Sequence, residues 1–353
     1  MLAWLRRLLA GPDAPRPARP PTDAPPPARP AAAPAPDAAA SPFAPFAAVL
    51  GLRPAGAPLP LDEAEELAVD ELGRRVLERA RAQKLGPASA PTLSLQVLNL
   101  VASPGAEISE MARLISADPA RSAGVLKVAN SAAVRGLMEI ETVRDAITRL
   151  GIDEVGRVAG ALAARSLFNP RVKTQLEGGG ASFAALYKRA VVVATAAADL
   201  AMRVRARPDR AFLGGMLHDV GRTVALHAFL EGLPPAARPG PLDLQRMRLM
   251  VDRIHVELGA EIHQDWDLPQ YLTVLAVRHH DAVVPGEEEF RDLHVVRLVA
   301  ALHDLTHDDA VVLRAGLEVA QSAGVLGMSP VAVRAAFADL RQAEGRVQAA
   351  FGL

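Results

Sequence analysis

The chain has 353 residues and a formal net charge of −1, contains no cysteine, and is half hydrophobic but only 4% aromatic. The lack of cysteine excludes disulfides and thiolate metal sites, and the near-zero charge argues against a nucleic-acid-binding protein. With so few aromatic residues, the core must be built from Ala, Leu and Val, which favours helices over strands. We therefore predict an all-α fold.

Residues 1–10 have the pattern of a short amphipathic helix, with Trp4, Leu5 and Leu8 on one face and two arginines beside them. The segment is too short to cross a bilayer, and no run of eighteen or more apolar residues occurs elsewhere. We expect no transmembrane segment. Residues 1–10 remain a candidate for peripheral contact with a membrane or a partner.

Residues 11–60 are dominated by proline and alanine and hold more than half of the 29 prolines of the chain. Proline removes backbone donors and alanine offers little surface to bury, so no packed core is expected. This composition predicts a disordered tether with polyproline character, of the kind found in extended linkers. A charged amphipathic helix is predicted to follow within residues 61–84.

From residue 85 onward, apolar residues recur at helical spacing between short connections, which predicts a compact multi-helix bundle. Asp118 and Pro119 have the pattern of an N-cap followed by the first helical residue, Thr142 caps another helix, and Gly151 ends it. Residues 286–353 are predicted to add C-terminal helices packed on this domain.

A series of short motifs occurs in order along this region. They are Asp118-Pro119 through Asn130-Ser131, Ile140 through Gly151, Gly214 through Gly221, His255 through Ala260, Trp266 through Pro269, and Arg278-His279-His280. Their order and spacing resemble the HDOD domain, a bacterial all-helical relative of the HD metal-dependent phosphohydrolases. The resemblance covers residues 85–285 and implies an HD-like helical fold.

The adjacent His218 and Asp219 are the centre of the candidate site, in an apolar run expected to form a helix. The alternative for this pair is a capped helix end with a core histidine that is hydrogen-bonded. All nine histidines of the chain lie between His218 and His307. An imidazole and a carboxylate that converge on one point can bind one divalent cation. The resemblance adds His255, His279 and His280 to this candidate metal site.

Two positions depart from the HD pattern. The resemblance implies a metal-binding histidine on an earlier helix, where this chain has Arg189. It also implies a later aspartate, for which Asp304 is the nearest candidate, although Ala300 or Ala301 is an alternative at the matching turn. A guanidinium cannot bind a cation and opposes one nearby. The Gly-Tyr-Pro loop of the cyclic di-GMP phosphodiesterases is absent after His280.

Several interpretations remain open at this point. The histidines either hold a metal or bond to backbone carbonyls as the remnant of an ancestral site. Asp118 and Asn130 are explained by capping and turn chemistry. The interpretation of the two helices around Gly151 as a DNA-binding helix-turn-helix is weak, because the second helix offers few basic residues to contact DNA. The histidines without a motif are expected at the surface or at helix ends: His227, His263, His294, His303 and His307.

The sequence therefore favours a cytoplasmic bacterial signalling protein with one HDOD domain, which acts by binding a protein or ligand without turnover. A protein partner and a nucleotide second messenger are the expected partners, and no nucleic acid is expected. No cofactor is required by this interpretation. The alternative is a metal-dependent phosphohydrolase acting on a cyclic or other nucleotide, with a divalent metal at His218 and Asp219.

Overall fold

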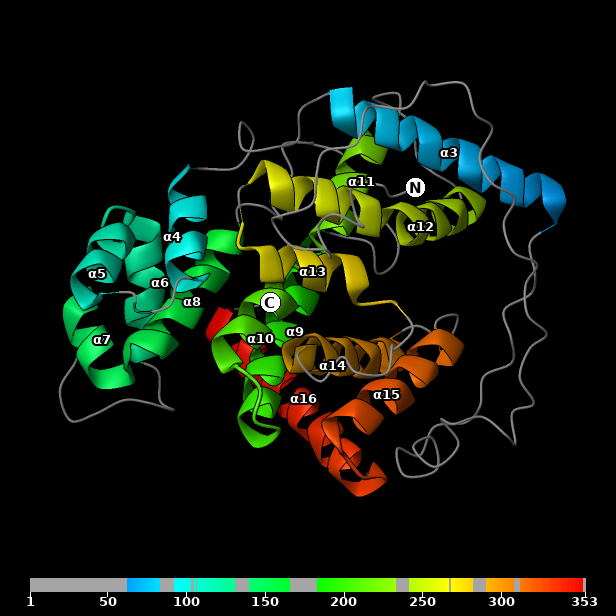
Figure 1. The fold of residues 1–353 in the computed structure, drawn as a ribbon. Helices are drawn as coiled ribbons and strands as arrows, with labels where there is room; N and C mark the ends of the chain where they lie inside the picture. The colour runs from blue at the N-terminus through cyan, green and yellow to red at the C-terminus, as the bar shows by residue number, and fades with distance from the viewer. Residues whose placement is uncertain are drawn as a thin grey trace, which may run out of the picture. The chain divides into compact units, whose positions relative to one another are not determined.

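Figure 1 shows the fold in a computed structural model of the chain, in which every element of the described residues is a helix. The residues that the structure describes belong to one compact unit and form no strand, which confirms the all-α prediction for them. They are residues 62–82, 92–102, 105, 107–130, 140–165, 183–232, 241–266, 268–281, 290–307 and 312–351. The segments predicted for residues 1–10 and 11–60 lie outside these ranges, as does Ser131.

Five consecutive helices pack on one another in the first part of the domain (Figure 1). Their inward-facing side chains, among them Leu98, Ile115 and Ile147, are almost fully buried. Helix α10 contacts α4 and α8 and joins this group to the rest of the domain. The five helices are α4 (Thr92–Ala102), α5 (Ile108–Ser116), α6 (Pro119–Ala129), α7 (Val143–Leu150) and α8 (Ile152–Arg165).

The ends of these helices follow the capping chemistry predicted from the sequence. The Asp118 carboxylate accepts a hydrogen bond from the Arg121 backbone N–H at 3.3 Å, at the start of α6. Thr142 accepts one from the Asp145 N–H at 3.1 Å and caps α7. Gly151 ends α7 with a φ of 87°, in the left-handed region that glycine adopts without strain. Local side chains thus determine where these helices start and stop.

Asn130 connects two segments that are ten residues apart in the chain. Its amide Nδ2 donates to the Ile140 carbonyl at 2.8 Å, and its Oδ1 accepts from the Ile140 N–H, also at 2.8 Å. Ile140 itself is buried. The side chain therefore satisfies both backbone groups of Ile140 and fixes the entry to α7, a role beyond the turn chemistry expected from the sequence.

The candidate site lies among six later helices. Helix α9 packs against both α10 and α14, α11 packs against α12, and α13 contacts α10, α12 and α14 (Figure 1). The core is rich in alanine and valine, as the composition predicts. The six helices are α9 (Phe183–Arg203), α10 (Pro208–Leu217), α11 (Val220–Glu231), α12 (Pro241–Asp265), α13 (Gln270–Arg278) and α14 (Arg291–His307).

Helix α3 (Glu63–Ala82) packs on α11 and α12 through a buried stripe that includes Val69 and Val76. Exposed ion pairs join it to α12, with Arg253 bonded to Asp70 at 2.6 Å. At the other end of the chain, α15 (Val312–Leu326) packs on α14, and α16 (Pro330–Phe351) packs on α9. Both ends of the described chain therefore pack against helices of the candidate site.

Two further expectations can be compared with the structure. Most of α8 is buried against α4, α6, α7 and α10, which leaves little of its surface for the DNA groove that a recognition helix would occupy. Among the described helices, none is by itself long and apolar enough to cross a membrane. One bent pair, Ala315–Leu326 with Pro330–Gln348, passes that test by length and composition only.

Replacing Asn130 by aspartate tests its bonds to Ile140. Aspartate keeps the acceptor but has no N–H to donate to the Ile140 carbonyl, so we expect the free energy of unfolding to fall by about 1–3 kcal/mol. Urea denaturation of Asn130→Asp against the parent measures this. Thr148→Ala, which removes an exposed hydroxyl in α7, should change little. Equal stability of Asn130→Asp and the parent would show that the hydrogen bond from Asn130 to the Ile140 carbonyl contributes nothing to folding.

Candidate functional site

The His218–Asp219 doublet lies in the turn between α10 and α11, which agrees with the helix-end alternative and not with a position inside a helix. His218 ends α10, and Asp219 precedes α11 with φ −108° and ψ 15°, outside the helical range. The break rotates one residue relative to the next, so the two side chains converge. His218 Nε2 and Asp219 Oδ2 are 3.5 Å apart.

Two glycines bring the neighbouring helices against this turn. A Cβ on Gly215 would lie 2.6 Å from the Ala194 Cα, so α10 contacts the backbone of α9 directly. A Cβ on Gly221 would lie 1.9 Å from the His255 carbonyl oxygen, so α11 meets α12 equally closely. Only a residue without a side chain permits such approaches. The doublet is therefore held between the helices that carry Arg189 and His255.

Three histidines of the site are held in the same way, each by a carbonyl three residues earlier in the chain. The Nδ1 atoms of His218, His255 and His279 lie 3.0, 2.9 and 2.8 Å from the carbonyls of Gly215, Asp252 and Ala276. A carbonyl only accepts, so each Nδ1 carries the proton. In the neutral ring, Nε2 then has a lone pair. Burial lowers the pKa of His218 to about 3 and that of His255 well below its usual value.

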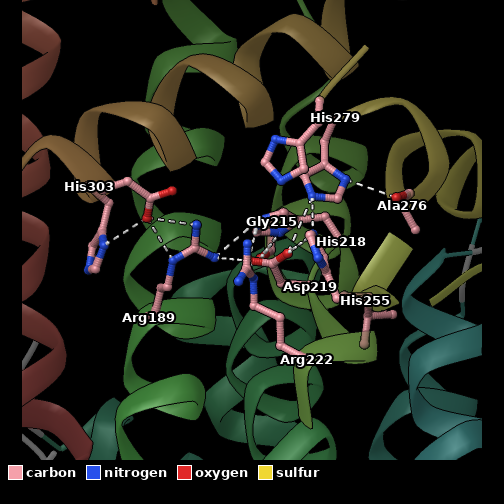
Figure 2. Close-up of polar contacts among 12 residues, drawn as sticks. Arg189, Gly215, His218, Asp219, Arg222, His255, Ala276, His279 and His303 are labelled. Atoms are coloured by element: carbon pink, nitrogen blue, oxygen red, sulfur yellow. Dashed lines mark hydrogen bonds and ion pairs between the residues drawn. The ribbon is translucent and has the colours of Figure 1, made fainter. Parts of the chain in front are cut away.

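The Nε2 atoms of His255 and His279 approach one carboxylate oxygen of Asp219 (Figure 2). The two Nε2 atoms are 3.3 Å apart and lie 3.4 and 3.3 Å from Asp219 Oδ1. This oxygen is buried, and no N–H or O–H of the described residues donates to it in hydrogen-bond geometry. Candidate ligand atoms of Asp219, His255, His279 and His280 all lie within 4.8 Å of one another. We call these four residues the histidine group.

Arg189 occupies the other side of Asp219 and bridges two carboxylates (Figure 2). Its Nη1 is paired with Asp219 Oδ2 and lies 3.3 Å from His218 Nε2, a lone pair to which it can donate. Its Nη2 and Nε bond to Asp304 Oδ1 at 2.9 and 3.1 Å. All three side chains are at least four-fifths buried. The arginine predicted from the sequence to replace a histidine thus supplies the positive charge between the two aspartates.

Arg222, one turn after the doublet, is a second cation at the site. Its Nε lies 3.1 Å from Asp219 Oδ2, and its Nη2 bonds to Asp252 Oδ1 at 3.0 Å. Burial by itself would raise the pKa of Asp219, but the charges of Arg222 and Arg189 outweigh it and hold that pKa well below its usual value. Arg189 does the same for the pKa of Asp304. Both carboxylates are therefore charged at neutral pH.

Of the five residues predicted as metal ligands, four form the histidine group and His218 faces Arg189 instead. Asp304 reaches the site, whereas Ala300 and Ala301 are buried core residues. Arg222 was missed by the sequence reasoning, although its spacing of three from Asp219 on a helix was a usable signal. His280 is also bonded to a residue that no motif indicated: its Nδ1 lies 2.8 Å from Glu318 Oε1 of α15.

The prediction for the remaining histidines is partly wrong. His263 lies in the last turn of α12 but is fully buried, with Nε2 3.2 Å from the Leu217 carbonyl. His294 is buried near the start of α14. His303 is buried within α14, beside Asp304, and is neither a surface nor a terminal residue. These three histidines are buried because the packing of their helices places them in the interior, although their side chains are polar. The side chain of His307 lies outside the described part.

A family model for the HDOD domain matches residues 88–282, more than half of the chain. The chain therefore belongs to the HDOD family, as the sequence motifs predicted. A curated relative from Treponema pallidum (strain Nichols), named only as an uncharacterized protein, is 24% identical over 211 residues. That match covers 58% of this chain and 39% of the relative, so this chain spans about two fifths of the length of the relative.

Two solved structures share the fold. One, from Marinobacter aquaeolei VT8 and provisionally described as a signal transduction protein, is 20% identical, with a TM-score of 0.53 over 74% of this chain and 58% of the other. The second, from Shewanella amazonensis SB2B and provisionally described as a phosphohydrolase, is 22% identical, with a TM-score of 0.50 over 75% and 95%. At these identities the likeness establishes an HD-like helical fold and nothing more.

The two halves of the site differ in their fitness for a metal. The histidine group offers imidazole nitrogens and an unsatisfied carboxylate oxygen, a donor set that suits one divalent cation such as Zn²⁺. The space between Asp219 and Asp304 does not suit a second cation, because the Arg189 guanidinium already bonds to both. The residues present therefore fit one metal ion at most, beside a fixed positive charge.

Arg189→Met tests whether the guanidinium holds the site together. The substitution leaves Asp304 buried without its main cation, so we expect the free energy of unfolding to fall by about 3–5 kcal/mol. Adding Asp304→Asn should recover part of this loss, because it removes the unpaired charge. Urea denaturation of the single and double variants measures both effects. Arg203→Met, which breaks an exposed ion pair on the same helix, should cost no more than about 1 kcal/mol.

The pH dependence provides a second readout. In the parent, Asp219 and Asp304 have lowered pKa values, so their contribution to stability is present above the usual carboxyl pKa and is lost as the pH falls. Arg189→Met should weaken this acid-side loss, because the pKa of Asp304 rises toward or above its unfolded value. The bridging role would be contradicted if Arg189→Met had the same free energy of unfolding as the parent and lost stability with falling pH in the same way.

Proposed function

We propose that this chain is a signal-transduction protein of the bacterial cytoplasm whose HDOD domain acts by binding a protein or a ligand, without turnover. Family membership and the fold shared with the Marinobacter structure support a role in signalling. The observation that carries the proposal of no turnover is the position of Arg189, bonded to Asp219 and Asp304 together.

A metal-dependent phosphohydrolase needs a cation with an open coordination position, where a bound water loses its proton and becomes the nucleophile. Here a guanidinium lies between the two aspartates, and it can neither bind water as a Lewis acid nor leave that position by exchange. Burial and four charged or polar contacts hold it there. The geometry thus favours a fixed structural centre over a hydrolytic one.

The centre joins α9, the turn between α10 and α11, α12, α13 and α14 through side-chain contacts. A partner or ligand that displaces one of these helices changes the environment of the others. We expect a protein partner in a signalling pathway or a nucleotide second messenger in this role. No cofactor is required, although the histidine group admits one divalent cation as a bound ligand and not as a catalyst.

The second candidate is a metal-dependent phosphohydrolase acting on a cyclic or other nucleotide. The arrangement of Asp219, His255, His279 and His280 favours it, since these residues offer a compact donor set with a buried, unsatisfied oxygen. Such a centre would lack the ligand that Arg189 replaces. It would also have to lower the pKa of water beside two positive guanidinium groups, which repel the cation and oppose the reaction.

Hydrolysis of cyclic di-GMP, with Mn²⁺, Fe²⁺ or Mg²⁺ supplied in turn, separates the two candidates. We expect no product from the parent. Arg189→His removes the fixed charge and restores a ligand, so its divalent-metal affinity, measured by calorimetry, should rise by at least about tenfold. Arg203→His makes the same substitution at an exposed position on the same helix and should leave metal affinity unchanged.

Robust product formation by the parent, abolished in Asp219→Ala, would establish the phosphohydrolase and overturn the proposal. Equal metal affinities of Arg189→His and the parent would show that the arginine is not what limits cation binding.

A further inference from the structure

His280 differs from the other histidines of the histidine group in what holds it. His255 and His279 are fixed by carbonyls of their own helical turn. The Nδ1 of His280 instead lies 2.8 Å from a carboxylate oxygen of Glu318, a residue 38 positions further along the chain. The orientation of this candidate ligand therefore depends on a separate helix.

Glu318 belongs to α15, which lies beyond the residues 88–282 matched by the family model. It is 4% exposed, although it is an acidic residue in an apolar helix. Charged side chains are seldom buried unless they are paired or hydrogen-bonded. The bond to His280 gives this buried glutamate a role that an exposed surface position could not provide. Helix α15 also packs on α14, the helix of Asp304.

The contact with Glu318 determines which ring nitrogen of a neutral His280 carries the proton. A carboxylate accepts a hydrogen bond, so it favours the tautomer in which Nδ1 of His280 carries the proton. The lone pair is then on Nε2, and the ring of His280 lies 4.0 Å from that of His279 and 5.2 Å from that of His255 between centroids. A carboxylate behind a histidine both fixes the ring and makes the opposite nitrogen a better metal ligand.

We propose that Glu318 is the positioning residue of the histidine group, and that α15 is thereby part of a site for one divalent cation. Glu318 holds the ring of His280 beside those of His255 and His279, and with Asp219 these residues give a set of three imidazoles and one carboxylate, as Zn²⁺ binds in four-coordinate sites. This inference rests on the bound-ligand role of the histidine group in the proposed function. It adds that α15, through Glu318, determines whether His280 is oriented as the fourth ligand of that group.

The test compares three variants of the full chain. Glu318→Leu removes the acceptor and keeps a similar volume, so Zn²⁺ affinity measured by calorimetry should fall by about 10–100-fold. Glu318→Gln keeps an acceptor oxygen and should restore most of the affinity. Ser322→Ala, four residues along the same helix and equally buried, should bind Zn²⁺ as the parent does. The order of these affinities distinguishes positioning from a general loss of packing.

A readout on the metal-free protein does not depend on affinity. Nitrogen-15 NMR of the histidine rings should show His280 with its proton on Nδ1 in the parent and in Glu318→Gln, and a shift toward Nε2 in Glu318→Leu. An unchanged tautomer in Glu318→Leu would overturn the inference, as would failure of the parent to bind Zn²⁺ or equal Zn²⁺ affinities of Glu318→Leu and the parent. Cyclic di-GMP turnover by the parent would contradict the proposed function alone.

Discussion

The site is organised by one buried carboxylate, Asp219, whose negative charge must be balanced by side chains from several helices. A charge removed from water is tolerated only when opposite charges or hydrogen bonds replace its hydration. Two guanidinium groups, from α9 and α11, contact its Oδ2, while its Oδ1 faces the Nε2 atoms of two imidazoles. The second oxygen remains short of a donor. The carboxylate thus favours one arrangement of α9 and α11 and still has the capacity to bind a cation.

Arg189 supplies the positive charge that an HD-like fold needs between its two aspartates. A metal ion and a guanidinium both supply positive charge between Asp219 and Asp304, so either can hold α9, the doublet and α14 together. Only the metal can also activate water. Exchanging a metal for the guanidinium would retain the electrostatic contribution to folding and give up the activation of water, which is the change that the proposed function without turnover requires.

Much of this arrangement could be predicted from the sequence because it depends on local chemistry. The caps at Asp118 and Thr142 and the stop at Gly151 are encoded within a few residues of each helix end. The arginine at position 189 was also identified as a departure from the HD pattern, and the structure places it at the site. Gly221 was recognised only as part of a motif, and its contact with the His255 carbonyl explains why a side chain is excluded there.

The features that the sequence did not reveal are set by tertiary contacts. The sequence left the doublet either on a helix or at a capped helix end, because the run around it is apolar and neither His218 nor Asp219 is a helix breaker such as proline or glycine. Asp304 could not be chosen over its neighbours, since helix register alone does not say which residue faces α9. Glu318 lies outside every motif, and a lone glutamate in an apolar helix gives no indication of its partner 38 residues away.

The central claim is that the Arg189 guanidinium, and not a metal, lies between Asp219 and Asp304. Anomalous diffraction from crystals of the parent grown with excess Mn²⁺ tests it most directly. The account predicts no anomalous peak between the two carboxylates, with Arg189 bonded to both, and allows a peak only at the histidine group. A Mn²⁺ ion bound by both Asp219 and Asp304, with the side chain of Arg189 turned away, would contradict it.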